Sequence, residues 1–133
     1  MSILVGYVPT PVGEVAADAA IYEATLRQEE LLIVNSKREG VVVDKTVASD
    51  AELSNVLNKA QAAGVKATLL QSTHSDDLAD EILDLAEKHD VSLIVIGLRH
   101  RTQVGKFIMG SLAQRILLQA ERPVLAVKAR AIK

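Results

Sequence analysis

The sequence predicts an α/β domain built on an open parallel β-sheet with helices on both faces, and three observations lead to this prediction. The chain has 133 residues, a length typical of one domain, and 49% of them are hydrophobic. Only 2% are aromatic, so the core must be built from Val, Ile, Leu and Ala, which suits strands buried on both faces of a parallel sheet. Short apolar runs alternate with stretches of helical periodicity, and such alternation favours right-handed crossovers between parallel strands. We therefore expect one domain over residues 1–133.

Five short apolar runs are expected to form the strands. They are Ile3–Tyr7, Leu31–Asn35, Lys66–Leu70, Ser92–Ile96 and Val124–Val127. The one long connection runs from Lys37 to Ala48. Because it is charged and contains only a short valine run, we expect a surface loop or a short extra strand there.

Two helices are expected between the first three strands. The alanine-rich stretch from Val12 to Arg27 predicts the first helix. Ser49 or Asp50 can cap the second helix, and Gly64 is suited to end it. The candidate buried residues are Val15, Ala19 and Leu26 in the first helix and Leu53, Val56, Leu57 and Ala60 in the second.

Two further helices are expected in the second half of the chain. Ser75 is expected to begin the third, because acidic residues in its first turns suit the positive end of the helix dipole. Ser111 is expected to begin the fourth. The predicted core-facing residues are Leu78, Ile82, Leu85 and Ala86 in the third helix and Leu112, Ile116 and Leu117 in the fourth.

Composition excludes several classes of protein. The formal net charge of −2 gives no overall attraction to nucleic acid or to a membrane surface. The chain contains no cysteine, so disulfides, thiol catalysis and cysteine-bound metals are excluded. The N-terminus lacks the basic lead and long apolar run of a signal peptide, and no window approaches the ~18 apolar residues of a membrane span. A cytoplasmic protein is the default expectation.

The segment from Gly97 to Ser111 carries the strongest functional signal, because ligands of open α/β sheets bind beyond the carboxyl ends of the strands. Glycine at position 97 allows a ligand to approach the backbone closely. Gly110 and Ser111 stand at a helix start, where free backbone N–H groups and the helix dipole favour an anion. The segment also contains the donors Arg99, His100, Arg101 and Lys106. These features favour an oxyanion such as a nucleotide phosphate; the alternative is an ordinary loop with turn-forming glycines and solvated cations, and residue types alone leave both open.

The spacing Gly97-x2-His100-x9-Gly110-Ser111 resembles the G-x2-G-x9-G-[S/T] phosphate loop of universal stress proteins. The similarity extends along the chain, to the segments Ile3–Gly6, Ser92–Gly97, Gly110–Leu117 and Arg122–Val127. It implies an adenine nucleotide α-hydrolase-like fold with strand order 3-2-1-4-5. It also implies that many members are homodimers through the fifth strand, and that one group of members binds ATP while another lacks the motif.

The resemblance implies a set of nucleotide-binding residues in this sequence. They are Pro9, Thr10, Ser36, Gly97, Arg99, His100, Gly105, Lys106, Gly110 and Ser111. Two departures from the family pattern affect this set. His100 replaces the middle glycine of the loop, and Val8 stands where nucleotide-binding members carry an aspartate beside the adenosine. The phosphate part of the site is therefore largely present, whereas the adenosine part has lost an acid.

Two functions follow from this comparison. The first is a regulatory protein of the stress response that binds ATP or another adenine nucleotide, with or without Mg²⁺, and that at most hydrolyses ATP slowly. The second is a dimeric stress-response interaction module with a degenerate, nucleotide-free pocket. Asp76 and Asp77 can reach a Mg²⁺ ion, but acids in the first turn of a helix are the commoner explanation. We expect no catalytic residue and no built metal site, and we expect a homodimer to pair through the apolar edge Val124–Val127.

Overall fold

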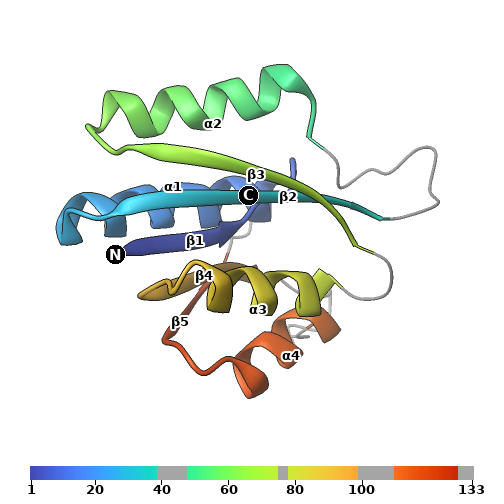
Figure 1. Ribbon diagram of the computed structural model, residues 1–133. Helices are drawn as coiled ribbons and strands as arrows, with labels where there is room; N and C mark the ends of the chain where they lie inside the picture. The colour runs from blue at the N-terminus through green and yellow to red at the C-terminus, as the bar shows by residue number, and fades with distance from the viewer. Residues whose placement is uncertain (39–47, 75–77, 99–109, 129–133) are drawn as a thin grey trace.

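The structure is a computed structural model that describes residues 1–38, 48–74, 78–98 and 110–128. Strands and helices alternate along this part of the chain (Figure 1). In order they are β1 (Ser2–Gly6), α1 (Pro11–Arg27), β2 (Glu30–Arg38), α2 (Asp50–Ala62), β3 (Ala67–His74), α3 (Leu78–Lys88), β4 (Leu93–Leu98), α4 (Ser111–Gln119) and β5 (Val124–Lys128).

All neighbouring strands of the sheet are parallel, and their order is β3-β2-β1-β4-β5. This confirms the predicted fold class and strand order. Helices α1 and α2 cover one face, and α3 and α4 cover the other (Figure 1). Because all strands are parallel, their carboxyl ends lie together along one end of the sheet, which we call the carboxyl edge. The residues that precede the strands lie together along the opposite end, which we call the amino edge.

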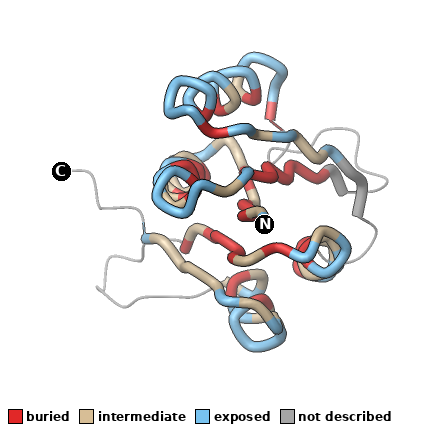
Figure 2. The backbone as a smooth tube through the Cα atoms, turned by 60° about the vertical axis from the view of Figure 1, so that its left-hand side comes forward, coloured by how far each residue is buried: buried red, intermediate tan, exposed pale blue. Residues whose placement is uncertain are grey.

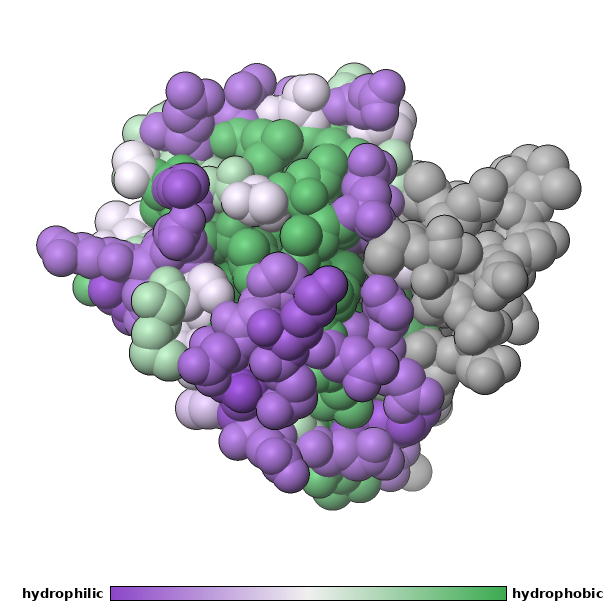
Figure 3. All heavy atoms as spheres, viewed as in Figure 1, coloured by the Kyte–Doolittle hydropathy of each residue, from purple (hydrophilic) through white to green (hydrophobic). Residues whose placement is uncertain are grey.

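The core consists of two apolar layers, one on each face of the sheet (Figure 2). Successive side chains of a strand point to opposite faces, so Ile3 and Val5 belong to the α1–α2 layer and Leu4 to the α3–α4 layer. Aliphatic residues dominate both layers, as the low aromatic content requires, and Tyr7 is the one buried aromatic side chain in the described part of the chain. Where β3 forms the outer edge, apolar atoms show at the surface between α2 and α3 (Figure 3).

Two helix starts agree with the local sequence. Thr10 caps α1, because its Oγ1 accepts a hydrogen bond from the Gly13 N–H at 3.1 Å. Ser49 caps α2 in a reciprocal arrangement with Glu52, which confirms Ser49 over Asp50 as the capping residue. Gly64 follows the end of α2 with a φ of 79°, a conformation that glycine adopts without strain.

Strands β2 and β3 are longer than predicted. The pairing of β1 with β2 ends at Val34, which lies opposite the last residue of β1. The pairing of β2 with β3 continues beyond it, from Asn35 opposite Gln71 to Arg38 opposite His74. The hydrophobic pattern misses this extension because the added residues are polar, whereas backbone pairing does not depend on side-chain polarity. The start of the predicted 37–48 connection thus belongs to β2, while residues 39–47 lie outside the described residues, as does the predicted helix start at Ser75.

The predicted buried face of α1 is wrong for Leu26 and is only partly confirmed by Ala19, which packs against the core. Leu26 is 62% exposed, and Val15 and Ala19 are only half-buried. The buried face is formed instead by Gly13, Ala16, Ala17, Ala20, Ile21 and Ala24. Most of these residues are small, and small side chains let α1 lie close to the sheet. The buried face of α1 is therefore its small-residue face and not the face with its largest apolar side chains. Leu117 of α4 is likewise partly exposed, while Ile116 and Ala113 are buried.

Candidate functional site

A cavity of about 80 Å³ lies at the carboxyl edge of the sheet, where β1, β2 and β4 end against the first turns of three helices. The described residues that line it are Gly6, Tyr7, Val8, Val12, Gly13, Val34, Ser36, Leu78, Ile82, Ile96, Gly97, Leu112 and Ala113. Among these, Tyr7 and Ser36 have the only polar side chains, so the cavity is predominantly apolar. This is the place where the strand order reverses, between β1 and β4, and where open α/β sheets bind ligands.

Glycines bring the walls of the cavity together. A Cβ atom at Gly13 would lie 1.7 Å from the Val8 carbonyl oxygen, so only glycine lets the first turn of α1 pack against the turn that follows β1. A Cβ atom at Gly97 would lie 2.4 Å from Val12 Cγ1 and 2.8 Å from the Val12 carbonyl oxygen. The described structure thus explains Gly97 by the packing of α1 on β4, a reason that the sequence did not indicate.

Tyr7 anchors the wall of the cavity that follows β1. Its ring is buried, and its hydroxyl donates a hydrogen bond to the Glu14 carboxylate in the first turn of α1. Burial and the neighbouring Glu14 carboxylate raise the pKa of the Tyr7 hydroxyl well above its ordinary value of about 10. Glu14 also pairs with Lys59 of α2 at 3.6 Å. Tyr7 is therefore a neutral, hydrogen-bonded part of the scaffold at physiological pH.

Asn35 and Ser36, in the second half of β2, are the buried polar residues among the side chains that the structure describes. The Asn35 Nδ2 group donates to the Tyr7 carbonyl oxygen at 2.9 Å, and its Oδ1 accepts from the Ala48 N–H at 3.2 Å. Sequence reasoning included Ser36 but missed Asn35. The available signal was a single asparagine directly after four consecutive apolar residues, since a polar side chain in a buried strand needs partners.

The N-terminus of α4 lies beside the cavity. Gly110 is its N-cap residue, with extended backbone and no side chain to bond the first N–H groups, and Leu112 and Ala113 of the first turn line the cavity. No described atom lies within 4 Å of a Cβ placed at Gly110. Ser111 is exposed. Among the described residues no side chain caps this helix end, which places its first N–H groups and the positive end of its dipole next to an apolar space.

Some of the predicted site residues come together and others cannot be placed. Ser36 and Gly97 line the cavity, and Gly110 and Ser111 lie next to it. Pro9 and Thr10 belong to the turn between β1 and α1, where Thr10 serves as the cap of α1. Val8, which stands where nucleotide-binding members of the family carry an aspartate, lines the cavity. Outside the described residues lie Arg99, His100, Arg101, Gly105, Lys106, Asp76 and Asp77.

Comparison with known proteins gives consistent results. The model of the universal stress protein family matches residues 1–128. A universal stress protein of Mycolicibacterium smegmatis is 40% identical over 126 residues, which cover 95% of this chain and 96% of that protein.

Solved structures agree with the observed fold. The structure of a universal stress protein from Archaeoglobus fulgidus has a TM-score of 0.81 and 29% identity, and it covers 96% of this chain and 98% of its own. A universal stress protein from Archaeoglobus fulgidus in complex with dAMP has a TM-score of 0.71 and 23% identity, with the same coverage. Within the described part of the chain, none of the helices has both the length and the apolar character needed to cross a membrane.

Proposed function

Because this chain belongs to the universal stress protein family, we propose that it is a regulatory protein of the stress response that binds ATP or another adenine nucleotide. The observation that carries the proposal is the placement of an apolar cavity directly beside the N-terminus of α4, whose N-cap residue, Gly110, has no side chain to bond the first N–H groups. An adenine nucleotide combines features that suit both, since its base has apolar aromatic faces and its phosphate is anionic. The dAMP complex of the related protein from Archaeoglobus fulgidus supports the choice of an adenine nucleotide.

The two parts of the site have different tasks. Leu112 and the neighbouring lining residues exclude water from the base, while the N–H groups after Gly110 and the Ser111 hydroxyl bind phosphate oxygens. Pockets that enclose whole ligands have volumes of about 300–1,000 Å³, so a cavity of about 80 Å³ receives only part of the base. The phosphates then lie outside it, toward the loop between β4 and α4. We propose that Arg99, His100, Gly105 and Lys106 of this loop complete the phosphate site.

The fit to a magnesium ion is weaker. The described residues that line the cavity include no carboxylate, and hard cations such as Mg²⁺ prefer oxygen ligands. We therefore assign no Mg²⁺ ligand among the described residues of the cavity. A nucleotide carries Mg²⁺ through its own phosphates, and no step of binding needs a protein ligand for the metal.

Calorimetric titration with ATP, ADP and AMP tests the proposal. We expect the wild-type protein to bind at least one of them, and Gly110→Val to bind about tenfold more weakly or worse, because the branched side chain fills the space in front of the α4 N–H groups. The described surroundings of Gly110 are open, but valine is a less favourable N-cap residue than glycine, so the melting temperature should fall modestly. Binding is therefore compared at a temperature at which both proteins are folded.

The control for this experiment is Gly110→Ala. The single methyl group does not branch into the space in front of the α4 N–H groups and accepts no hydrogen bond from them, so this variant should fold and retain binding. If the wild type binds none of the three nucleotides at millimolar concentration, the second function is favoured, that of an interaction module with a degenerate pocket. The small apolar cavity, with Val8 in its wall, is the observation that speaks for that alternative.

We also propose that the protein is a homodimer through β5. Val124 to Val127 are all half-buried, and within the described chain β5 pairs on one side only, with β4. An apolar edge strand with unpaired backbone groups favours pairing with a second copy.

Leu125→Asp tests the dimer, because it places a charge in the middle of this edge. Analytical ultracentrifugation should show a dimer for the wild type and for Asn58→Asp, a matched control at an exposed site on α2, and a monomer for Leu125→Asp. A circular dichroism melt checks that Leu125→Asp remains folded. An unchanged sedimentation coefficient in folded Leu125→Asp would exclude pairing through β5.

A further inference from the structure

A buried side chain joins two backbone segments that are far apart in the sequence. Asn35 is 3% exposed and lies in the second half of β2. Its amide nitrogen donates to the carbonyl oxygen of Tyr7, the residue after β1, at 2.9 Å. Its amide oxygen accepts from the N–H of Ala48, the residue before the N-cap of α2, at 3.2 Å. Asparagine suits this place because its amide group carries both a donor and an acceptor.

Asn35 does not line the cavity, but its first partner does. Tyr7 and Val8 form one wall, and the peptide bond between them is a rigid plane. The Tyr7 carbonyl that Asn35 holds lies in this plane, so the hydrogen bond determines how the plane is turned. Removing the donor also leaves a buried carbonyl without that partner, which favours a rotation of the wall.

Other contacts hold the remaining sides of the same wall. The Tyr7 N–H donates to the Val34 carbonyl oxygen at 2.8 Å, and the Val8 carbonyl oxygen accepts from the Thr10 N–H at 2.8 Å. The Val8 carbonyl also lies against Gly13, so it has little room to adjust. Within this set, the Asn35 amide is the contact that reaches from the wall to the start of α2.

We propose that Asn35 is a positioning residue of the nucleotide site. It orients the Tyr7–Val8 wall of the cavity and ties that wall to the start of α2 through Ala48. The proposal rests on the proposed nucleotide-binding function, and it adds a route by which an occupied cavity affects a region outside the site. A change at the wall reaches the Ala48 N–H through a single side chain.

Asn35→Asp is the informative substitution because its effect depends on pH. At pH 7.5 the carboxylate can accept from the Ala48 N–H but cannot donate to the Tyr7 carbonyl, and it places a negative charge beside that oxygen. The protonated acid restores both bonds, since one oxygen donates and the other accepts. Burial raises the pKa of such a carboxyl above its ordinary value of about 4. The change from carboxylate to protonated acid is thereby moved toward a pH at which the protein can be studied.

Affinity for the nucleotide is measured at pH 7.5 and at pH 5.5, each time relative to the wild type at the same pH. Asn35→Asp should bind about tenfold more weakly at pH 7.5 and should recover to within about threefold at pH 5.5. Asn35→Leu, which has a similar shape and can make neither bond, should bind weakly at both values. Asn58→Asp, exposed on α2, should match the wild type at both. Hydrogen exchange of the Ala48 amide should slow when nucleotide binds to the wild type, and not in Asn35→Leu.

The outcomes separate this proposal from the proposed function. A wild type that binds no nucleotide removes both. If the wild type binds nucleotide and both Asn35→Asp and Asn35→Leu bind it equally well, the positioning role alone is overturned. The same role is overturned by an affinity of folded Asn35→Asp that stays low at a pH at which NMR titration shows the introduced carboxyl to be protonated, because a loss without recovery then indicates a general packing defect instead of a missing donor.

Discussion

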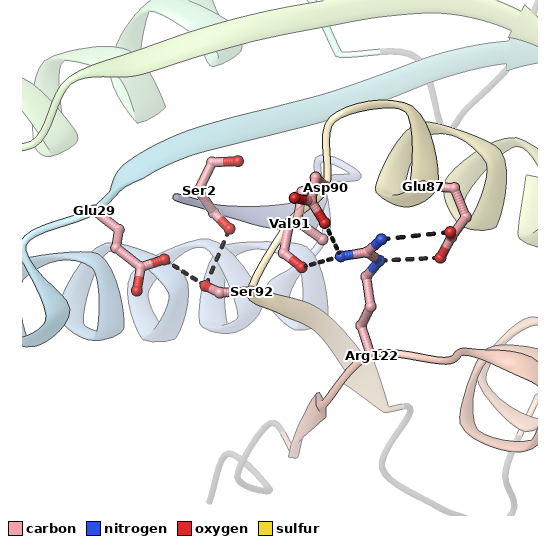
Figure 4. Close-up of polar contacts among 7 residues, drawn as sticks. All are labelled: Ser2, Glu29, Glu87, Asp90, Val91, Ser92 and Arg122. Atoms are coloured by element: carbon pink, nitrogen blue, oxygen red, sulfur yellow. Dashed lines mark hydrogen bonds and ion pairs between the residues drawn. The ribbon is translucent and has the colours of Figure 1, made fainter.

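The two edges of the sheet are joined to their surroundings in different ways. At the amino edge, polar side chains reach from one element to the next (Figure 4). The Ser92 hydroxyl, just before β4, lies 3.2 Å from the carbonyl oxygen of Ser2 and is hydrogen-bonded to the Glu29 carboxylate before β2. Three segments that are distant in sequence are thereby linked through one hydroxyl group.

Arg122 makes the second group of contacts at the amino edge (Figure 4). Its guanidinium donates to the Asp90 carboxylate at 2.7 Å, to the Val91 carbonyl oxygen at 2.9 Å and to the Glu87 carboxylate at 3.0 Å. The hydrogen bonds with Glu87 and Asp90 raise the pKa of Arg122 above its ordinary value. The start of β5 is thus attached to the end of α3 and the start of β4.

At the carboxyl edge the contacts around the cavity are made mainly by the backbone and by small residues. Gly13 and Gly97 allow close approach of α1, and apolar side chains surround the remaining space. The comparison teaches that side-chain contacts join the elements at the amino edge, whereas close backbone packing joins them at the carboxyl edge, around a cavity and beside the start of α4. Variants at the amino edge should therefore change stability alone, whereas variants at the carboxyl edge should change binding as well.

The largest effect on stability is expected for Gly13→Ala at the carboxyl edge. The new Cβ would lie 1.7 Å from the Val8 carbonyl oxygen, so α1 or the turn before it must move. Forced overpacking costs typically 1–3 kcal/mol, and we expect a loss of about 2–3 kcal/mol in the free energy of unfolding by urea titration, together with weaker nucleotide binding. Gly110→Ser is the matched glycine control and should change the free energy of unfolding by less than about 0.5 kcal/mol. Equal stability of Gly13→Ala and the wild type would show that the close approach at Gly13 is not required.

A smaller effect is expected for Arg122→Gln at the amino edge. The variant loses the charge that pairs with Glu87 and Asp90, so its melting temperature should fall, but by less than that of Gly13→Ala. Nucleotide affinity should not change, because Arg122 lies at the edge opposite the cavity. Adding salt should narrow the difference from the wild type, since salt screens exposed ion pairs. Reduced affinity in a fully folded Arg122→Gln would contradict the separation of the two edges.

Much of the fold could be predicted from the sequence because it depends on local patterns. Apolar runs of β-branched and aliphatic residues located all five strands, and Ser49 and Gly64 marked the ends of α2. The likeness to universal stress proteins supplied the strand order, which the observed sheet and the family match confirm. Of the candidate site, the sequence indicated Ser36, Gly97, Gly110 and Ser111, which lie at or beside the cavity.

The remaining features could not be predicted because they depend on distances between elements. Leu26 was expected to be buried by its periodicity, yet small residues of α1 face the sheet and Leu26 is exposed. The polar ends of β2 and β3 continue the ladder without any hydrophobic signal. The role of Asn35 depends on its hydrogen bonds with Tyr7 and Ala48, and these two residues lie next to Asn35 only in the folded chain.

The sequence by itself therefore determined the layered α/β fold and the loop between β4 and α4 as the place to look for an anion, since residue type and spacing carry both. Only the tertiary structure decided what lies beside the start of α4: an apolar cavity with one wall that Asn35 holds by a hydrogen bond and that packs closely at Gly13 and Val8. The physical reason is that periodicity encodes which side of an element is buried. The size of a cavity and the partners of a buried amide depend on how closely separate elements approach.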